Sequence, residues 1–173
     1  MAWLTEQKCD ATIRPVNDLW TVCPACKRFV ERAVWQDNLK VCPACNAHDR
    51  LGCRERLALL ADPGSFEELN AAVGFNDPLK FADESGTYAD KARATAAKTG
   101  VGEAIVTGTA TLGGRPVVLG VMDFRFMGGS LGSGTGERIL LAAEAALAKR
   151  LPLILVSASG GARMHEGIVS LMQ

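Results

Sequence analysis

The sequence predicts an α/β protein that begins with a four-cysteine zinc ribbon. Two observations lead to this class. The spacing Cys-x2-Cys occurs twice, first at Cys23 and Cys26 and again at Cys42 and Cys45. Beyond residue 102, two apolar strand-like segments flank a helix-like one. A strand, helix, strand order is typical of a crossover between parallel strands of one sheet, which places the larger part of the chain in the α/β class.

Composition excludes several function classes. The chain has 173 residues, and its 19 Lys and Arg balance 19 Asp and Glu, so no overall basic field attracts nucleic acid or anionic lipid. The longest apolar stretches are far shorter than the roughly 20 residues that span a bilayer, and the first ten residues lack the apolar segment of a signal peptide. We therefore expect a cytoplasmic protein with no membrane partner. Clustered thiols in that reducing compartment hold metal more often than they form disulfides.

Both cysteine pairs lie in the same local sequence, C-P-A-C, and fifteen residues separate them. Two Cys-x2-Cys turns can place four thiolates at the corners of a tetrahedron, which suits zinc or, less often, iron, and a closed set of this kind is structural. The alternatives are two disulfides, which the compartment disfavours, and a redox centre, which would have a single pair. We expect three further candidate donors not to bind the metal: Cys9, His48 and Cys53.

The first half of the chain is expected to hold three segments: a lead-in over residues 1–19, the ribbon over 20–48 and a helical connecting region over 49–102. Alternation within residues 27–41 predicts a hairpin that returns to the second cysteine turn. In the connecting region we expect a helix from residue 49, a new helix start at Ser65 and a short helix around 88–97. Basic residues in the ribbon leave a nucleic-acid or protein binding module open as an alternative function, although acidic residues lie among them.

Residues 103–173 carry the sheet. A hairpin is expected from segments 103–112 and 115–124, joined by a turn at Gly113-Gly114, and a glycine-rich loop follows. A helix over 137–150 is expected to bury Ile139, Ala143, Ala146 and Leu147. A second buried strand over 153–156 then leads through Gly160-Gly161 into another helix.

Two glycine pairs, Gly128-Gly129 and Gly160-Gly161, each follow one of the expected parallel strands. The carboxyl ends of such strands share one edge of a sheet, so we expect both pairs to meet there. Adjacent glycines let the backbone approach a ligand closely, and N–H groups at a helix start can hold a negative oxygen. The simpler alternative is a pair of tight turns without a ligand. No dinucleotide, Walker or G-x-S-x-G motif is present.

Two side chains after the second glycine pair stay open. Arg163 can neutralise a phosphate or a neighbouring carboxylate, and the sequence does not decide between them. His165 can act as a base or pack as an ordinary surface histidine.

The segments VMDFRFMGGSLGSGTGERI (121–139) and SASGGARMHEGIVSLMQ (157–173), with the ribbon, DPGSFEEL (62–69) and NDPLKF (76–81), resemble a known family. The chain is similar to the β subunit of bacterial acetyl-coenzyme A carboxylase carboxyltransferase, and the resemblance runs from Trp20 to Gln173. It implies that a crotonase-like ββα spiral follows the ribbon, with residues 103–173 as its N-terminal part, so that the spiral in this chain is incomplete.

The resemblance implies transfer of a carboxyl group from carboxybiotin to acetyl-CoA, which gives malonyl-CoA for fatty acid biosynthesis. The glycine turns would then stabilise a thioester enolate, with Gly160 and Gly161 as catalytic residues. Substrate binding would fall to Gly128, Gly129, Ser130 and Arg163. A carboxylase or decarboxylase of another acyl-CoA is the alternative within the same chemistry.

The implied partners are a carboxyltransferase α subunit in an α2β2 transferase, a biotin carboxyl carrier protein that carries the biotin, and a biotin carboxylase. ATP binding is implied for the complete enzyme. The sequence departs from the family in two ways: His165 stands where Gln is usual, and family members continue beyond Gln173. We therefore expect a fragment, an early-terminated product or one piece of a split subunit, and we expect the 173-residue chain to lack carboxyltransferase activity even when the α subunit and carboxybiotin are supplied.

Overall fold

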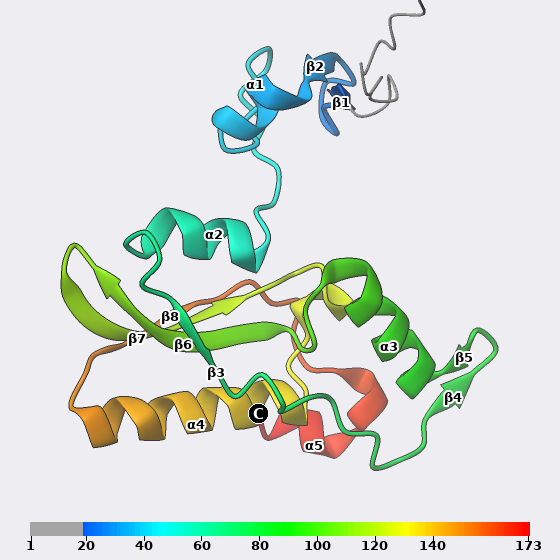
Figure 1. Ribbon diagram of the computed structural model, residues 1–173. Helices are drawn as coiled ribbons and strands as arrows, with labels where there is room; N and C mark the ends of the chain where they lie inside the picture. Colours follow the sequence, from blue (N-terminus) through cyan, green and yellow to red (C-terminus); the bar gives the residue numbers. More distant parts are fainter. Residues whose placement is uncertain (1–18) are drawn as a thin grey trace, which may run out of the picture. The chain divides into compact units, whose positions relative to one another are not determined.

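The computed structural model describes residues 19–173 (Figure 1), so Cys9 and nearly all of the expected lead-in lie outside the described part. The chain divides into two compact units, of which the second comprises Gly52–Gln173. The first unit holds the ribbon and the second holds the main sheet.

The ribbon is built from a hairpin and a short helix. Strands β1 (Trp20–Val22) and β2 (Phe29–Glu31) pair antiparallel, and helix α1 (Arg32–Asp37) follows directly. The hairpin expected over residues 27–41 is therefore wrong beyond β2. Trp35 explains the difference, because the helical turn buries its indole against the first and second cysteine turns.

The second unit contains a four-stranded sheet in the order β3-β6-β7-β8. Its strands are β3 (Glu67–Leu69), β6 (Ile105–Leu112), β7 (Arg115–Met122) and β8 (Leu153–Val156). Antiparallel pairing of β6 with β7, and parallel pairing of β7 with β8, confirm the expected hairpin and crossover. The helix start expected at Ser65 is wrong, since residues 67–69 pair with β6 and the ladder overrides local helix propensity.

Helices cover both faces of this sheet (Figure 1). Side chains alternate along a strand, so Val117, Leu119 and Val121 of β7 point to one face and Val118 to the other. The first set packs against α2 (Cys53–Leu60), and Val118 packs against α4 (Ser133–Lys149). The core of the unit is thus two apolar layers separated by the sheet.

Helix α4 begins at Ser133, inside the segment expected to be a glycine-rich loop. Its first N–H donates to a carboxylate oxygen of Glu166 at 2.6 Å, which replaces the side-chain cap that Gly132 cannot supply. Its buried residues include the polar Thr135 and Arg138, whereas Leu147 is 80% exposed. The expected apolar face is therefore wrong for Leu147, because buried polar partners set the rotation of the helix.

Strand β8 lies at the edge of the sheet, paired with β7 alone among the described residues. Ile154 and Leu155 are 37% and 45% exposed, so the expectation of a fully buried strand is wrong. Within residues 19–173, no helix combines the length and apolar character required to cross a membrane.

The remaining elements are short. The segment between β3 and β6 holds a small hairpin, β4 (Ala82–Asp83) with β5 (Gly86–Thr87), and helix α3 (Tyr88–Thr99), which confirms the helix expected around 88–97. Thr87 caps α3 by accepting from the Asp90 N–H, and Gly100 ends it with φ of 71°. Two 3₁₀ turns, η2 (Met127–Gly129) and η3 (Met164–Glu166), and helix α5 (Ile168–Leu171) complete the fold.

Asp123 joins the start of α2 to the end of β7. Its fully buried carboxylate accepts from the N–H groups of Cys53 and Arg125, both at 2.9 Å, and from the Arg125 guanidinium at 2.7 Å. Burial by itself would raise the pKa of Asp123, but the Arg125 side chain and the two N–H donors hold it well below its usual range.

We expect Asp123→Asn to lower the free energy of unfolding at pH 7 by about 2 kcal/mol, since charged acceptors bind their donors more strongly than neutral ones. The folded-state pKa is depressed, so the ionised carboxylate stabilises the fold above its unfolded pKa of about 3.9 and this contribution is lost below it. Urea unfolding at neutral and acidic pH measures the difference, with the exposed Glu144→Gln as control. An equal loss at both pH values would contradict the assignment.

Candidate functional site

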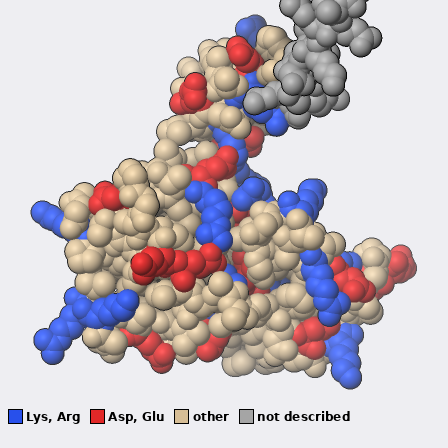
Figure 2. Space-filling model, in the orientation of Figure 1, with Lys and Arg blue, Asp and Glu red and all other residues tan. Residues whose placement is uncertain are grey.

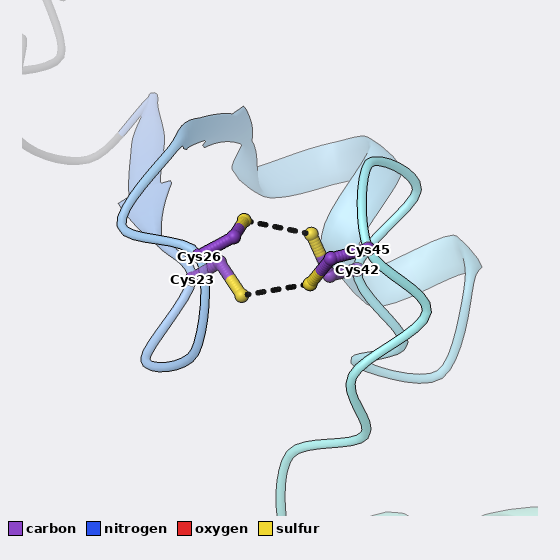
Figure 3. Close-up of side chains that lie close together, drawn as sticks. All are labelled: Cys23, Cys26, Cys42 and Cys45. Carbon is purple, nitrogen blue, oxygen red and sulfur yellow. Dashed lines mark hydrogen bonds between the residues drawn. The ribbon is translucent and has the colours of Figure 1, made fainter.

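The four cysteines of the two C-P-A-C turns converge in the ribbon (Figure 3). The sulfurs of Cys23 and Cys45 lie 3.7 Å apart, those of Cys26 and Cys42 lie 3.8 Å apart, and all four lie within 4.8 Å of one another. Tetrahedral zinc with Zn–S bonds of about 2.3 Å requires sulfurs roughly 3.8 Å apart. The cluster can therefore hold a zinc ion, as the spacing predicted.

The two cysteine turns have the same backbone geometry. The N–H of Lys27 donates to the Cys23 carbonyl at 3.0 Å, and Asn46 makes the equivalent bond to Cys42 at 2.8 Å. Both donors adopt positive φ, 61° for Lys27 and 58° for Asn46. These repeated turns aim each pair of sulfurs at one point, so the duplicated sequence becomes a duplicated structure.

The electrostatics of the thiols favour a bound cation. Hydrogen bonding from the Cys26 backbone N–H lowers the pKa of Cys23 to about 7. The Ala47 N–H lowers that of Cys45, but burial and the neighbouring sulfurs raise the pKa of Cys45 to about 12. Like charges at these distances oppose full ionisation, and a divalent metal removes that opposition.

The other expected non-ligands have different surroundings. Cys53 packs in the core of the second unit, where burial raises the pKa of its thiol to about 12. His48 forms a backbone bridge with Val41.

The two glycine pairs meet at the carboxyl ends of β7 and β8, as expected from the parallel pairing. The Gly160 N–H donates to the Gly128 carbonyl at 2.9 Å, and the Leu131 N–H donates to the Gly161 carbonyl at 2.8 Å. A Cβ on Gly129 would lie 2.0 Å from the Ala158 carbonyl oxygen, so only glycine allows this approach. The turns form one rigid backbone junction.

The N–H groups of the second pair are used differently. That of Gly160 is engaged by Gly128, whereas that of Gly161 is exposed and donates to the Ser159 hydroxyl at 3.1 Å. Gly161 has φ of 111°, which L side chains rarely adopt. The turn therefore presents one accessible N–H donor, already directed at an oxygen.

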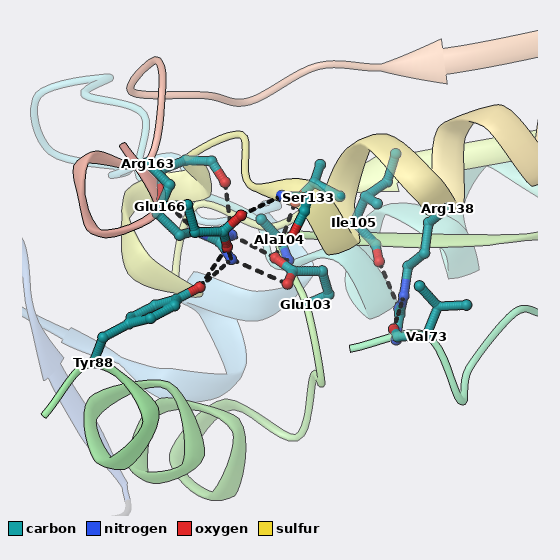
Figure 4. Close-up of polar contacts among 11 residues, drawn as sticks. Val73, Tyr88, Glu103, Ala104, Ile105, Ser133, Arg138, Arg163 and Glu166 are labelled. Atoms are coloured by element: carbon teal, nitrogen blue, oxygen red, sulfur yellow. Dashed lines mark hydrogen bonds and ion pairs between the residues drawn. The ribbon is translucent and has the colours of Figure 1, made fainter. Parts of the chain in front are cut away.

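Arg163 is fully buried and bonds to protein groups (Figure 4). Its guanidinium contacts both carboxylate oxygens of Glu103, the Tyr88 hydroxyl at 3.0 Å and the carbonyl of Ser130 at 2.7 Å, and its Nε donates to the Ser130 hydroxyl at 3.1 Å. Glu166 accepts from Tyr88 at 2.7 Å. We call Tyr88, Glu103, Arg163 and Glu166 the buried ion cluster.

Sequence reasoning missed Tyr88 and Glu103 as partners of Arg163. Glu103 precedes β6 and is separated from Arg163 by 60 residues, and no local spacing marks that contact. The available signal was a charged residue at the edge of an apolar strand. Glu166 was visible three residues after Arg163, but its contact with Ser133 across the fold was not.

His165 packs as a half-buried aromatic residue. Its ring stacks on Tyr88 with centroids 5.0 Å apart and meets the edge of Phe81 at 5.1 Å. Burial lowers the pKa of His165 below its usual range. These contacts favour the packing interpretation over the catalytic base.

Residues 45–173 match the model of the carboxyl transferase domain. Acetyl-coenzyme A carboxylase carboxyl transferase subunit beta of Parasynechococcus marenigrum (strain WH8102) is 51% identical over 157 residues, which cover 91% of this chain and 53% of that protein. Subunits beta/alpha of Salinispora tropica (strain ATCC BAA-916 / DSM 44818 / JCM 13857 / NBRC 105044 / CNB-440) are 51% identical over 157 residues, 91% of this chain and 28% of that one.

A crystal structure of transcarboxylase 12S with methylmalonyl-coenzyme A and methylmalonic acid bound aligns with a TM-score of 0.56 and 36% identity, over 71% of this chain and 22% of that one. The chain spans about half the length of the first of these curated relatives. The second unit has the crotonase-like carboxyltransferase fold that the resemblance implied. The chain belongs to the carboxyl transferase domain family.

Proposed function

We propose that the chain supplies the β component of the carboxyltransferase of an acetyl-CoA carboxylase. The reaction moves a carboxyl group from carboxybiotin, carried by a partner protein, to acetyl-CoA and gives malonyl-CoA. The observation that carries the proposal is the exposed Gly161 N–H, held at the junction of two interlocked glycine turns. The similarity to β subunits over 91% of the chain supports it.

The chemistry requires stabilisation of an enolate. Loss of a proton from the acetyl methyl group places negative charge on the thioester oxygen, and a pre-aimed N–H donor stabilises that charge. The methyl carbon then bonds to the carboxyl carbon of carboxybiotin. The bond between that carbon and the biotin nitrogen breaks, and the proton passes to the biotin nitrogen. In this proposal the thioester oxygen takes the place of Ser159 Oγ, which lies 3.1 Å from the Gly161 nitrogen.

The residues of the turns divide into two roles in this proposal. Gly161 is the catalytic donor. Gly160 and the first pair, Gly128 and Gly129, form the frame that holds it, because the Gly160 N–H is bonded to Gly128. Ser130 and Arg163 bond to each other, and we assign them to positioning in place of direct substrate binding.

The partners follow from the reaction. A carrier protein brings the biotin, a biotin carboxylase charges it with ATP, and an α subunit completes an α2β2 transferase. The Salinispora tropica relative, whose name joins beta and alpha subunits, supports the α partner. We place the complex in the cytoplasm and in lipid metabolism, with one structural zinc per ribbon.

A nucleic-acid binding module is less well supported. Acidic and basic side chains are interspersed on the face shown in Figure 2, and the formal net charge is zero. Binding driven by phosphate contacts needs a basic surface and weakens steeply with salt.

The test is direct. We expect these residues, within a complete β subunit that is assembled with its α subunit and supplied with carboxybiotin, to form malonyl-CoA from acetyl-CoA, as measured by chromatography of the CoA esters. Omission of the α subunit is the control. Carboxylation of propionyl-CoA in preference to acetyl-CoA, or release of CO2 from malonyl-CoA without transfer, would place the protein with another acyl-CoA enzyme.

A further inference from the structure

Arg163 has no donor left for a substrate. Its guanidinium has five N–H groups, and each meets an oxygen of Ser130, Tyr88 or Glu103. The side chain is fully buried, so a substrate phosphate or carboxylate cannot reach it without displacing one of these partners. Its effect on chemistry must therefore pass through the groups that it holds.

Those groups belong to the two glycine turns. Ser130 directly follows Gly129, and both its hydroxyl and its carbonyl accept from the Arg163 side chain. The Arg163 backbone N–H donates to the Leu131 carbonyl at 2.9 Å, one step beyond the bond between Leu131 and Gly161. The Arg163 side chain thus binds the residue that follows the first glycine turn, and its main chain follows the second glycine turn.

The other residues of the buried ion cluster connect Arg163 to the surrounding helices and strands. Glu103 leads into β6 and also accepts from Thr135 of α4 at 2.9 Å. Glu166 accepts from Tyr88 at the start of α3 and from the Ser133 N–H at the start of α4. Burial raises the pKa of Tyr88, so its hydroxyl stays protonated and donates. Both carboxylates share the one guanidinium and also accept from hydroxyl or N–H donors, so loss of any partner would leave a buried charge less well compensated.

We propose that the buried ion cluster is a positioning device that sets the Gly161 N–H relative to the reacting thioester. Arg163, Glu103 and Tyr88 are its positioning residues, and none of them touches substrate. This inference rests on the proposed function, and it states how the Gly161 N–H of that site is held in position. It predicts that loosening the cluster slows turnover more than it weakens substrate binding.

The experiment compares Arg163→Lys and Tyr88→Phe with Leu57→Ala, each made in a complete β subunit in complex with the α subunit. Leu57 is buried against the other face of the sheet, so its truncation destabilises the unit without touching the cluster. We expect Arg163→Lys to lower kcat about 100-fold, since a displacement of about 1 Å can cost that much, with a smaller change in KM. Tyr88→Phe, which keeps the ring and removes one hydroxyl, should lower kcat about tenfold. Leu57→Ala should lower the melting temperature and leave kcat unchanged.

A second readout does not depend on activity. Amide hydrogen exchange within residues 128–131 and 160–163 should quicken in Tyr88→Phe and Arg163→Lys but not in Leu57→Ala, while exchange in the middle of α4 stays unchanged. If both cluster variants keep the kcat and the exchange of the wild type, or follow Leu57→Ala, the inference is wrong. Should Arg163→Lys fail to fold, Tyr88→Phe decides the question. A wild-type complex that forms no malonyl-CoA would overturn the proposed function, and the exchange data would still decide this inference.

Discussion

Cys26→Ser and Cys45→Ser are each expected to abolish stoichiometric zinc binding and to unfold the ribbon. The ribbon's core contains Cys23, Val30, Trp35 and Cys42, so the metal cluster and the apolar core are one structure. A structural zinc site contributes about 10–16 kcal/mol of apparent binding free energy, far more than a ribbon core of this size supplies by itself. Loss of one thiolate from a closed set should therefore collapse the unit.

Elemental analysis of the purified proteins measures the metal, and tryptophan fluorescence follows the exposure of Trp35, which is 5% exposed in the fold. Cys53→Ser is the matched control, because Cys53 lies in the other unit, where it is the first residue of α2 and packs in the apolar core. It should retain one zinc per chain. Full zinc content in both Cys26→Ser and Cys45→Ser would show that the four sulfurs do not form the site.

The metal cluster could be predicted because its information is local. Each C-P-A-C turn fixes two sulfurs within four residues, and the same turn occurs twice. Helix α1 could not be predicted, because its residues alternate in the way that is typical of a strand. In the fold they are helical, and the helix packs Trp35 against the cysteines. The secondary structure of such a short segment depends more on tertiary packing than on its own sequence pattern.

The meeting of the glycine turns could be predicted from topology. Parallel pairing of two consecutive strands brings their carboxyl ends to one edge, and the glycines follow those ends directly. The hydrogen bonding within the junction could not be predicted, so the sequence could not show that the Gly160 N–H is engaged while that of Gly161 is exposed.

The buried ion cluster lay beyond sequence reasoning for a different reason. Glu103 and Arg163 come together only after the sheet, α3 and α4 have packed, and neither residue belongs to a periodic pattern. Polar contacts also set the buried face of α4, which includes Thr135 and Arg138 in place of Leu147. Thr135 donates to Glu103 of the cluster, whereas Arg138 donates to backbone carbonyls outside it. Hydrophobic periodicity does not detect a face whose polar residues are buried with partners.

Gly161→Pro in the assembled enzyme is expected to lower kcat by about 10²–10³, the typical effect of removing one oxyanion donor. Proline deletes the N–H that now reaches Ser159 Oγ, and it also forces φ from 111° to about −65°. Because negative charge on the thioester oxygen develops mainly in the transition state, the loss should appear in kcat more than in KM. Steady-state kinetics with acetyl-CoA measures both constants.

Two matched variants separate the donor from the backbone strain. Gly161→Ala keeps the N–H, and its Cβ would meet nothing within 4 Å, so it tests only the cost of a side chain at φ of 111°. Ser159→Ala removes the hydroxyl that accepts from Gly161 and leaves the donor available for substrate. We expect both to retain much more activity than Gly161→Pro when circular dichroism and zinc content match the wild type. A folded Gly161→Pro enzyme with normal kcat, together with an inactive Ser159→Ala enzyme, would replace the enolate proposal with a serine nucleophile.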